Sequence, residues 1–222
     1  MCWSTGKDSA WALHLLRSRG DVEVVGLLTT VNRAASRVAM HGVRERLLEL
    51  QAEALGLPLT RVAIPERCSN RHYERAMAVA LGRAKDDGVS AVAFGDLHLE
   101  DVRRYREEQL AAVGIEPLFP LWGRDTADLA REMIRAGLRA RVTCIDPKVL
   151  DPSFAGRTYD GALLAALPDG VDPCGENGEF HTFAYRGPMF ALEIGVRGGA
   201  VVERDGFVFA DLQPADESAT TG

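Results

Sequence analysis

The sequence predicts an α/β protein in which a domain built on a parallel β-sheet (residues 1–121) is followed by a smaller α+β domain (residues 122–213). In the first part, short β-branched or leucine-rich runs alternate with helix-length segments whose apolar residues recur at helical spacing. That alternation is typical of a parallel sheet with helices on both faces. After residue 121 the pattern changes to short strands and turns. The small, polar residues 214–222 predict a disordered tail.

Four short segments predict the strands of the first domain, the first of them a β-branched and leucine-rich run typical of a buried strand. They are Val22–Leu28, Leu59–Ile64, Ala91–Phe94 and Pro117–Leu121.

Between these runs, apolar residues at helical spacing predict three helices, at about residues 43–54, 73–84 and 101–113. Gly56 ends the first of them, and Gly88 ends the second.

The second domain is predicted from a mixture of signals. Asp205-Gly206 stands between two β-rich arms within residues 201–209, which is a strong signal for a β-hairpin. The remaining expectations are a helix at 127–136, a strand at 141–145, a loop at 147–157 and a short helix at 159–167.

Composition narrows the class of protein. The 222 residues carry a net charge of −6, which makes nucleic acid an unlikely partner. No apolar run approaches the ~20 residues of a membrane helix, and no secretory pattern is present, so we expect a cytoplasmic protein without a membrane partner. The four cysteines form no Cys-x-x-Cys and are expected to be reduced thiols: Cys2, Cys68, Cys144 and Cys174.

Residues 4–9 have the composition of an anion-binding loop that opens a helix. The first turn of a helix carries unpaired backbone N–H groups, which bind anions well. Glycine allows close approach of an oxygen, and hydroxyl and ammonium groups add donors. A capped helix with an exposed Lys-Asp pair is the alternative. The loop consists of Ser4, Thr5, Gly6, Lys7, Asp8 and Ser9.

A second polar motif lies at residues 175–183. Its two carboxylates, its amide and its imidazole can handle a substrate, and its glycines permit backbone conformations that side chains forbid. The alternative is a solvated acidic turn before a strand. The motif consists of Gly175, Glu176, Asn177, Gly178, Glu179, Phe180, His181, Thr182 and Phe183.

The loop at residues 4–9 resembles the Ser-Gly-Gly-Lys-Asp-Ser loop of the N-type ATP pyrophosphatases, the PP-loop. The resemblance implies the adenine-nucleotide α-hydrolase fold, which is HUP-like and Rossmann-like, and cleavage of ATP between the α and β phosphates. Thr5 stands where the family has glycine. Only Met1-Cys2-Trp3 precede the loop, so either the first strand is stunted or the start of the chain is misplaced.

The motif at residues 175–183 is similar to the signature of the diphthine–ammonia ligase family, and we identify the chain as resembling a bacterial relative. Further matching segments occur in the family's order. They are Met40-His41-Gly42-Val43, Gly95-Asp96-Leu97, Pro120-Leu121-Trp122, Gly156-Arg157 and Gly187-Pro188-Met189-Phe190.

This resemblance implies an ATP-dependent ligase. A substrate carboxylate attacks the α-phosphate, pyrophosphate leaves, and ammonia displaces AMP to give an amide. Family members commonly read Gly-Glu-Gly-Gly-Glu-Phe-Glu-Thr, whereas this chain has Asn177 and His181 at the two differing positions. The substrate therefore stays open between diphthine on elongation factor 2 and a small metabolite, as do the ammonia source and a homodimeric assembly.

From these motifs we assign candidate residues. Gly95 and Asp96 follow a predicted strand, at the sheet edge where ligands gather, although Asp96 could instead cap a helix. Asp8 and Asp96 are the candidate Mg²⁺ ligands. The expected ATP-binding residues are Ser4, Thr5, Gly6, Lys7, Asp8, Ser9, Met40, His41, Gly95 and Asp96, and the candidate catalytic residues are Lys7, Glu176, Asn177, Glu179 and His181.

Two other functions fit parts of the sequence. A tRNA- or sulfur-modifying PP-loop enzyme would need a cysteine pair and a basic face, which this acidic chain lacks. A nucleotide-binding module without chemistry would keep its ATP affinity when the carboxylates of residues 175–183 are replaced.

Overall fold

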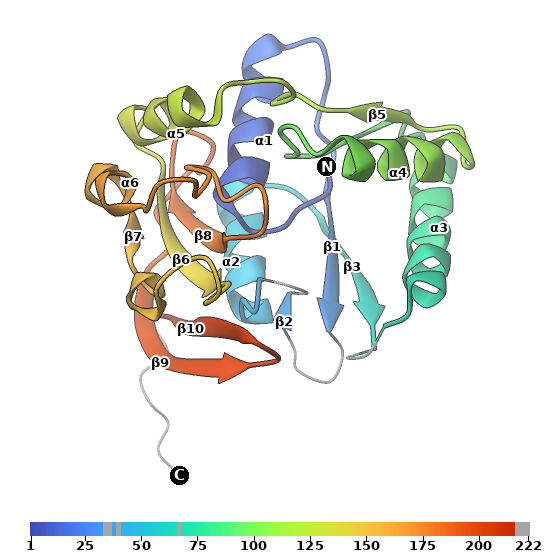
Figure 1. Ribbon diagram of the computed structural model, residues 1–222. Coiled ribbons are helices and arrows are strands. Elements are labelled where there is room, and N and C mark those ends of the chain that lie inside the picture. The colour runs from blue at the N-terminus through green and yellow to red at the C-terminus, as the bar shows by residue number, and fades with distance from the viewer. Residues whose placement is uncertain (33–36, 39–40, 66–67, 216–222) are drawn as a thin grey trace.

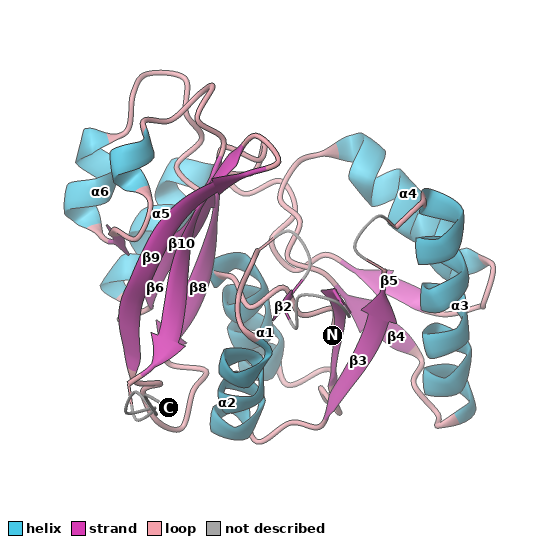
Figure 2. Cartoon of the chain, turned by 90° about the horizontal axis from the view of Figure 1, so that it is seen from below, coloured by secondary structure: helices cyan, strands magenta, loops and turns pink. Residues whose placement is uncertain are grey.

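The computed structural model describes residues 1–32, 37–38, 41–65 and 68–215 (Figure 1). It confirms the predicted mixture of a parallel sheet with helices and a second, smaller α/β part. Seen from below, the elements form layers, with α1 (Lys7–Arg19) and α2 (Glu45–Leu55) between the two sheets (Figure 2). The helices α3 (Asn70–Asp86) and α4 (Glu100–Ala111) cover the outer face of the first sheet.

The first sheet contains parallel strands that meet at the N-terminal residues. β1 (Leu27–Asn32) pairs in parallel with β3 (Leu59–Ile64), and β4 (Ala91–Ala93) pairs in parallel with β5 (Glu116–Leu118). A short β2 (Arg37–Val38) runs antiparallel to the end of β1.

Met1, Cys2 and Trp3 take the place of a short central strand. The Leu28 N–H donates to the Met1 carbonyl (2.9 Å) and the Trp3 N–H donates to the Leu28 carbonyl (2.8 Å), which ties them to β1. The Cys2 N–H donates to the Ala93 carbonyl of β4 (2.9 Å). These three residues therefore join the two strand pairs into one sheet, and the loop at residues 4–9 leaves from its carboxyl edge.

One strand prediction was wrong in position. The run Val22–Leu28 was expected to be the strand, but β1 occupies Leu27–Asn32, and Val25 is 55% exposed. The end of β1 is polar because Thr30 and Asn32 line a cavity, so hydrophobicity favoured the wrong segment. The strand at Leu59–Ile64 is confirmed with its predicted bounds.

The second sheet is antiparallel and has the order β7-β6-β10-β9, with β8 paired along β6. The predicted hairpin is confirmed: Asp205 and Gly206, both with positive φ (53° and 82°), connect β9 to β10 in a two-residue turn. Two helices, α5 (Thr126–Arg135) and α6 (Gly161–Ala166), and a 3₁₀ turn at Pro152–Phe154 complete this part. The strands are β6 (Arg139–Ile145), β7 (Thr158–Tyr159), β8 (Phe180–Arg186), β9 (Val196–Arg204) and β10 (Phe207–Pro214).

One buried apolar cluster runs through both parts of the chain. It includes Trp3 and Leu13 from the first part and Phe180 and Phe183 from the second. The two parts therefore share a core, and a division between residues 121 and 122 stays a prediction. At the C-terminal end, β10 continues to Pro214, so the first residue of the predicted tail belongs to a strand; residues 216–222 lie outside the described part.

The described helices bury apolar side chains such as Leu13 of α1, Leu81 of α3 and Leu129 of α5. Among these helices, none has the length and hydropathy needed to cross a membrane.

Candidate active site

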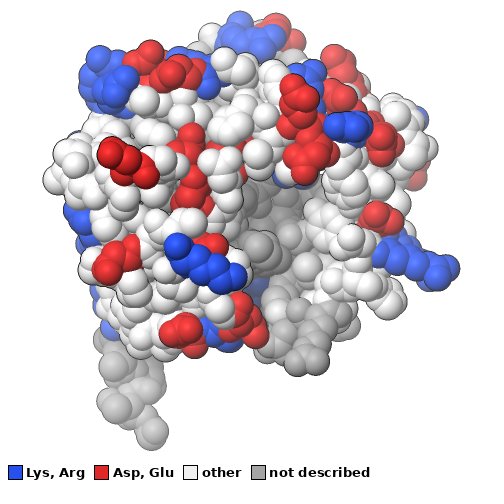
Figure 3. Space-filling view, in the orientation of Figure 1, with Lys and Arg blue, Asp and Glu red and all other residues white. Residues whose placement is uncertain are grey.

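A cavity of about 680 Å³ brings the two polar motifs together. The molecule is hollowed near the middle of one face, and acidic side chains lie along part of that hollow (Figure 3). The cavity is closed on one side by the ends of the parallel strands and on the other by β8. Its polar lining includes Ser4, Lys7, Asp8, Ser9, Asn32, His41, Asp96, Arg106, Glu176, His181 and Thr182.

The PP-loop (residues 4–9) is fixed through its backbone. The Ala184 N–H of β8 donates to the Thr5 carbonyl (2.9 Å), and the Lys7 N–H donates to the Thr182 hydroxyl (3.1 Å). Gly6 is the N-cap of α1 and has no side chain of its own to cap the N–H groups that follow. The first turn of α1 therefore opens into the cavity as the predicted anion cradle would require.

Two serines of the PP-loop form a small hydroxyl network beside this helix start. The Ser4 hydroxyl donates to the Ser9 hydroxyl (3.1 Å), which donates to the Gly6 carbonyl (3.0 Å). The Gly6 N–H donates back to Ser4 Oγ (3.3 Å). Both hydroxyl groups line the cavity and can reorient toward a ligand oxygen.

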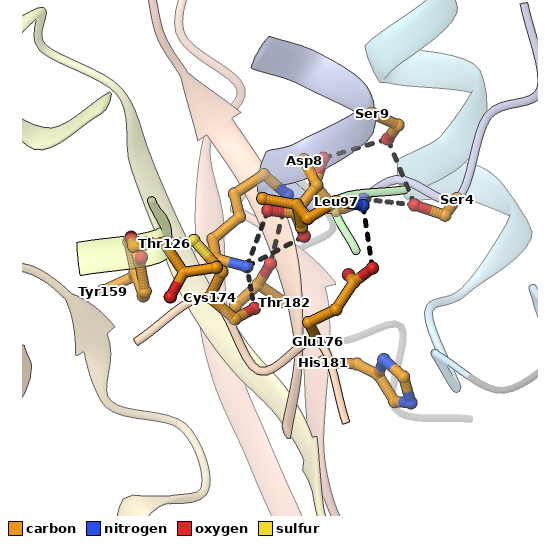
Figure 4. A network of polar contacts seen from close by, with 12 residues as sticks. Ser4, Asp8, Ser9, Leu97, Thr126, Tyr159, Cys174, Glu176, His181 and Thr182 are labelled. Atoms are coloured by element: carbon orange, nitrogen blue, oxygen red, sulfur yellow. Dashed lines mark hydrogen bonds and ion pairs between the residues drawn. The ribbon is translucent and has the colours of Figure 1, made fainter. Parts of the chain in front are cut away.

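Lys7 is almost fully buried, with an exposed fraction of 1%. Its ammonium donates to both carboxylate oxygens of Asp8 (2.9 and 2.8 Å) and to the Cys174 carbonyl (Figure 4). The nitrogen also lies 5.2 Å from the ring centre of Tyr159 and 5.4 Å from that of Phe180. Burial alone would lower the pKa of Lys7, but Asp8, together with Cys174 and Asp172, outweighs it and the pKa is raised. Lys7 therefore stays charged and links the PP-loop to residue 174.

Glu176 faces the cavity and bridges two loops. Its Oε1 accepts a hydrogen bond from the Leu97 N–H at 2.8 Å (Figure 4). It accepts a second one from the His98 N–H at 3.2 Å, just before α4. Burial raises the pKa of Glu176, although the two N–H groups favour the charged form. The carboxylate thus holds the segment after Gly95-Asp96 against the signature loop (residues 175–183).

Asn177 and Glu179 do not line the cavity and instead fold the signature loop on itself. The buried Glu179 carboxylate accepts from the Asp172 N–H (3.0 Å), the Asn177 N–H (2.9 Å) and the Asn177 side-chain amide (2.9 Å). Gly175 has φ 69°, and a Cβ there would lie 2.7 Å from the Phe180 carbonyl oxygen. The glycine is therefore required for the close approach that presents the start of β8.

His41 and His181 lie next to each other in the wall of the cavity. Their ring centres lie 4.6 Å apart, and His41 Nδ1 is 3.4 Å from the Thr182 carbonyl oxygen. Burial, followed by the neighbouring His181, lowers the pKa of His41 to about 3. Burial, followed by Lys7, lowers the pKa of His181 to about 4. Both imidazoles are therefore neutral near pH ~7. Met40, predicted to lie beside His41, is outside the described residues.

Gly95 and Asp96 lie where the sequence predicted, at the end of a strand, but Asp96 caps no helix. Its carboxylate pairs with Arg106 of α4 at 2.5 Å, and that guanidinium lies 4.4 Å from the ring centre of Phe94. A Cβ on Gly95 would lie 2.8 Å from the Ser9 nitrogen, so glycine lets this segment approach the start of α1.

The candidate magnesium ligands do not form a metal site by themselves. In the described part of the chain, no three His, Cys, Asp or Glu side chains converge on a point that could hold an ion. Asp8 is paired with Lys7 and Asp96 with Arg106. A Mg²⁺ ion needs only one or two protein carboxylates when substrate phosphates supply further oxygens, so Asp8, whose side chain is 26% exposed, fits that limited role.

Sequence reasoning missed two contributors to this site. Thr182 caps the Lys7 N–H through its hydroxyl, and Arg106 neutralises Asp96. Thr182 carried a signal, because it belongs to the signature motif between two core aromatic residues. Arg106 carried little signal, because it lies in a strongly charged helix whose arginines are expected to form a solvated face.

Comparisons with known proteins identify the same family in both parts of the chain. Residues 1–117 match the model of the diphthamide synthase N-terminal domain, and residues 125–209 match that of the C-terminal domain. The diphthine–ammonia ligase of Homo sapiens is 28% identical over 231 residues, covering 94% of this chain and 86% of the human protein. The diphthine–ammonia ligase of Rattus norvegicus is 31% identical, with the same coverage of both chains. The diphthine–ammonia ligase of Danio rerio is 31% identical and covers 86% of this chain and 83% of its own length.

Proposed function

This chain belongs to the diphthamide synthase (diphthine–ammonia ligase) family, and from that premise we propose that it is an ATP-dependent ligase that converts a carboxylate into an amide with ammonia. Diphthine on elongation factor 2 is the proposed carboxylate substrate, because the relatives are named for that reaction. The products would be the amide, AMP and pyrophosphate.

The observation that carries the proposal is the meeting of the PP-loop and the signature loop in one cavity. The PP-loop offers a helix start and hydroxyl groups, which suit phosphate oxygens. The signature loop lies opposite and presents Glu176 and His181. A nucleotide whose β and γ phosphates lie on the first loop would place its α-phosphate toward the second.

Several residues of the PP-loop then have a role in the first half of the reaction. Ser4, Ser9 and the first turn of α1 bind the departing pyrophosphate, and Lys7 keeps the Asp8 carboxylate neutralised beside it. Mg²⁺ would travel with the ATP phosphates, with Asp8 as its protein ligand, and would offset their negative charge. The substrate carboxylate attacks the α-phosphate, and ammonia then displaces AMP from the acyl-adenylate.

The neutral histidines suit the second half of this reaction. A nucleophilic ammonia must be uncharged, and a desolvated wall formed by two neutral imidazoles does not favour its protonated form. Glu176 orients the loop that closes this side of the cavity. We therefore place ammonia attack beside His41 and His181.

The test is a product assay with purified protein, ATP, Mg²⁺, ammonium and elongation factor 2 that carries diphthine. We expect AMP and pyrophosphate in equal amounts, and a peptide mass that reports replacement of a hydroxyl by an amino group. A panel of small carboxylates serves as the alternative substrate set. If no carboxylate supports AMP formation, the proposed ligase activity is wrong.

A matched pair of variants separates a ligase from a nucleotide-binding module. Glu176→Gln removes a cavity charge, whereas Glu203→Gln removes an exposed charge on β9. A ligase loses turnover only in the first variant. A module without chemistry forms no AMP in either variant, or in the parent protein.

A further inference from the structure

Gln51 is a buried polar side chain to which neither the signature motifs nor the reaction assigns a role. It lies on α2 and its exposed fraction is 0%. Its neighbours on the buried face of the helix include Leu47, Leu48 and Leu55. A carboxamide in such surroundings is unfavourable unless its donors and acceptor are satisfied.

The carboxamide of Gln51 connects three segments that are distant in sequence. The Trp3 indole N–H donates to Gln51 Oε1 at 2.8 Å. Gln51 Nε2 donates to the Thr5 carbonyl at 3.0 Å and to the Ala184 carbonyl at 2.6 Å. One side chain therefore joins the central strand residues, the PP-loop and β8.

Thr5 is the residue of the PP-loop that has to be held in place. Its φ is 71°, and among the described residues other than glycine only Asp205 also has a positive φ. This left-handed conformation is unfavourable for a β-branched residue and persists only where the surroundings enforce it. Its buried hydroxyl finds no hydrogen-bond partner in the described part of the chain, so no side-chain hydrogen bond offsets the cost of this conformation.

The neighbouring segments hold Thr5 in this conformation through hydrogen bonds to its carbonyl oxygen. This oxygen accepts one hydrogen bond from the Ala184 N–H and a second from Gln51. The next two residues, Gly6 and Lys7, are the N-cap and first residue of α1, so their orientation follows from the turn at Thr5. The PP-loops that this loop resembles have glycine at this position, and glycine adopts the left-handed conformation freely.

We propose that Gln51 is a positioning residue for the nucleotide: it holds the Thr5 carbonyl and thereby fixes the left-handed turn that presents the start of α1 to the phosphates. This inference rests on the proposed function of the cavity as an ATP site. Gln51 does not itself line that cavity and acts only through the loop.

The test measures the affinity of the full-length protein for a non-hydrolysable ATP analogue by titration calorimetry. Gln51→Met keeps the length and packing of the side chain but removes its hydrogen bonds, and we expect the affinity to fall by about tenfold. Adding Thr5→Gly, which adopts the turn without support, is expected to restore the affinity to within about threefold of the parent.

Arg17→Met is the matched control. Arg17 also joins distant segments, donating to the Leu55 and Met189 carbonyls, but it does so near the other end of α1. Its loss should lower the midpoint of urea unfolding without changing the affinity for the analogue. A purely structural role for Gln51 would give that same result.

The outcomes separate this inference from the proposed function. Unchanged affinity in Gln51→Met, or no recovery when Thr5→Gly is added, overturns the positioning role while the ATP site stands. Absence of analogue binding by the parent protein overturns the proposed function and the positioning role together.

Discussion

The PP-loop and the signature loop line one cavity, but the PP-loop is positioned through its backbone, whereas the signature loop contributes side chains. The PP-loop is held by backbone hydrogen bonds to β8, and its charged Lys7 is engaged with Asp8 and the Cys174 carbonyl. The signature loop contributes the side chains of Glu176 and His181, while its Glu179 folds the loop from within. A charged residue in a motif can therefore serve the shape of a site as much as its chemistry.

The strongest challenge to this comparison is the removal of the Lys7 ammonium. Lys7→Met leaves the Asp8 carboxylate without its partner, and breaking such a buried pair should lower the free energy of unfolding by about 3 kcal/mol. Urea denaturation measures the loss. Adding Asp8→Asn should recover part of it, because the uncompensated charge is then absent. Equal stability of parent and Lys7→Met would show that the link between the loops is unimportant.

The pH dependence of stability tests the signature loop through His181. The unfolded imidazole binds a proton below pH 6.5, whereas the folded one stays neutral down to about 4, so the folded state loses stability as pH falls through this window. Discounted for partial exposure, the loss from this residue is about 2 kcal/mol. His181→Asn should show a flatter dependence in urea unfolding between pH ~7 and pH ~4.5. An identical slope in both proteins would contradict the lowered pKa.

The close approach of Gly95 to the PP-loop provides a third test. In Gly95→Ala the new Cβ would lie 2.8 Å from the Ser9 nitrogen and 2.9 Å from the Asp8 carbonyl carbon. Backbone must move to accommodate it, so we expect a loss of about 2 kcal/mol in stability and weaker ATP binding. Gly82→Ala, inside α3 with nothing within 4 Å, is the control and should stabilise the protein by ~0.5–1 kcal/mol. Similar effects in both variants would show that the approach is not constraining.

The smallest expected difference compares the two glutamates of the signature loop. Glu176 uses only Oε1 as an acceptor, so Glu176→Gln can keep both hydrogen bonds. Glu179 uses both oxygens, so Glu179→Gln places an amide N–H against another donor. We expect about 1–2 kcal/mol of destabilisation in Glu179→Gln and little in Glu176→Gln, measured by urea unfolding at pH ~7. Equal losses would mean that the two carboxylates have the same structural role.

A pH series extends the comparison of these two variants. Because burial raises the pKa of Glu176 in the folded protein, the parent loses stability as pH rises from the ordinary glutamate pKa through that raised value. Glu176→Gln lacks this loss, so its free energy of unfolding should rise relative to that of the parent across the same pH window.

The sequence was most predictive where local signals decide the structure. Asp205-Gly206 predicted its hairpin because a two-residue turn with positive φ selects such residues. The strand at Leu59–Ile64 was predicted with the bounds that the structure has. β1 was misplaced because its carboxyl end serves the cavity and is polar there, while the preceding valines lie outside the sheet.

The candidate site was predictable as a set of segments but not as a set of contacts. The two motifs were expected to form one site, and the cavity between them is lined by both. The direction of the Lys7 ammonium depends on a carbonyl 167 residues away, and the role of Gln51 depends on contacts 46 and 133 residues away. No local pattern encodes such contacts, because they arise only when β8 packs against α1 and α2.

A structure of the protein with a non-hydrolysable ATP analogue and Mg²⁺ would test the proposed ATP site most directly. We predict that the β and γ phosphates lie against residues 4–9 and that the α-phosphate faces Glu176 and His181. The larger groove between β3 and α3, of about 1270 Å³ and lined by residues such as Val62, Ala76 and Val79, should hold no nucleotide. A nucleotide bound in that groove, or one whose α-phosphate points away from the signature loop, would contradict the account.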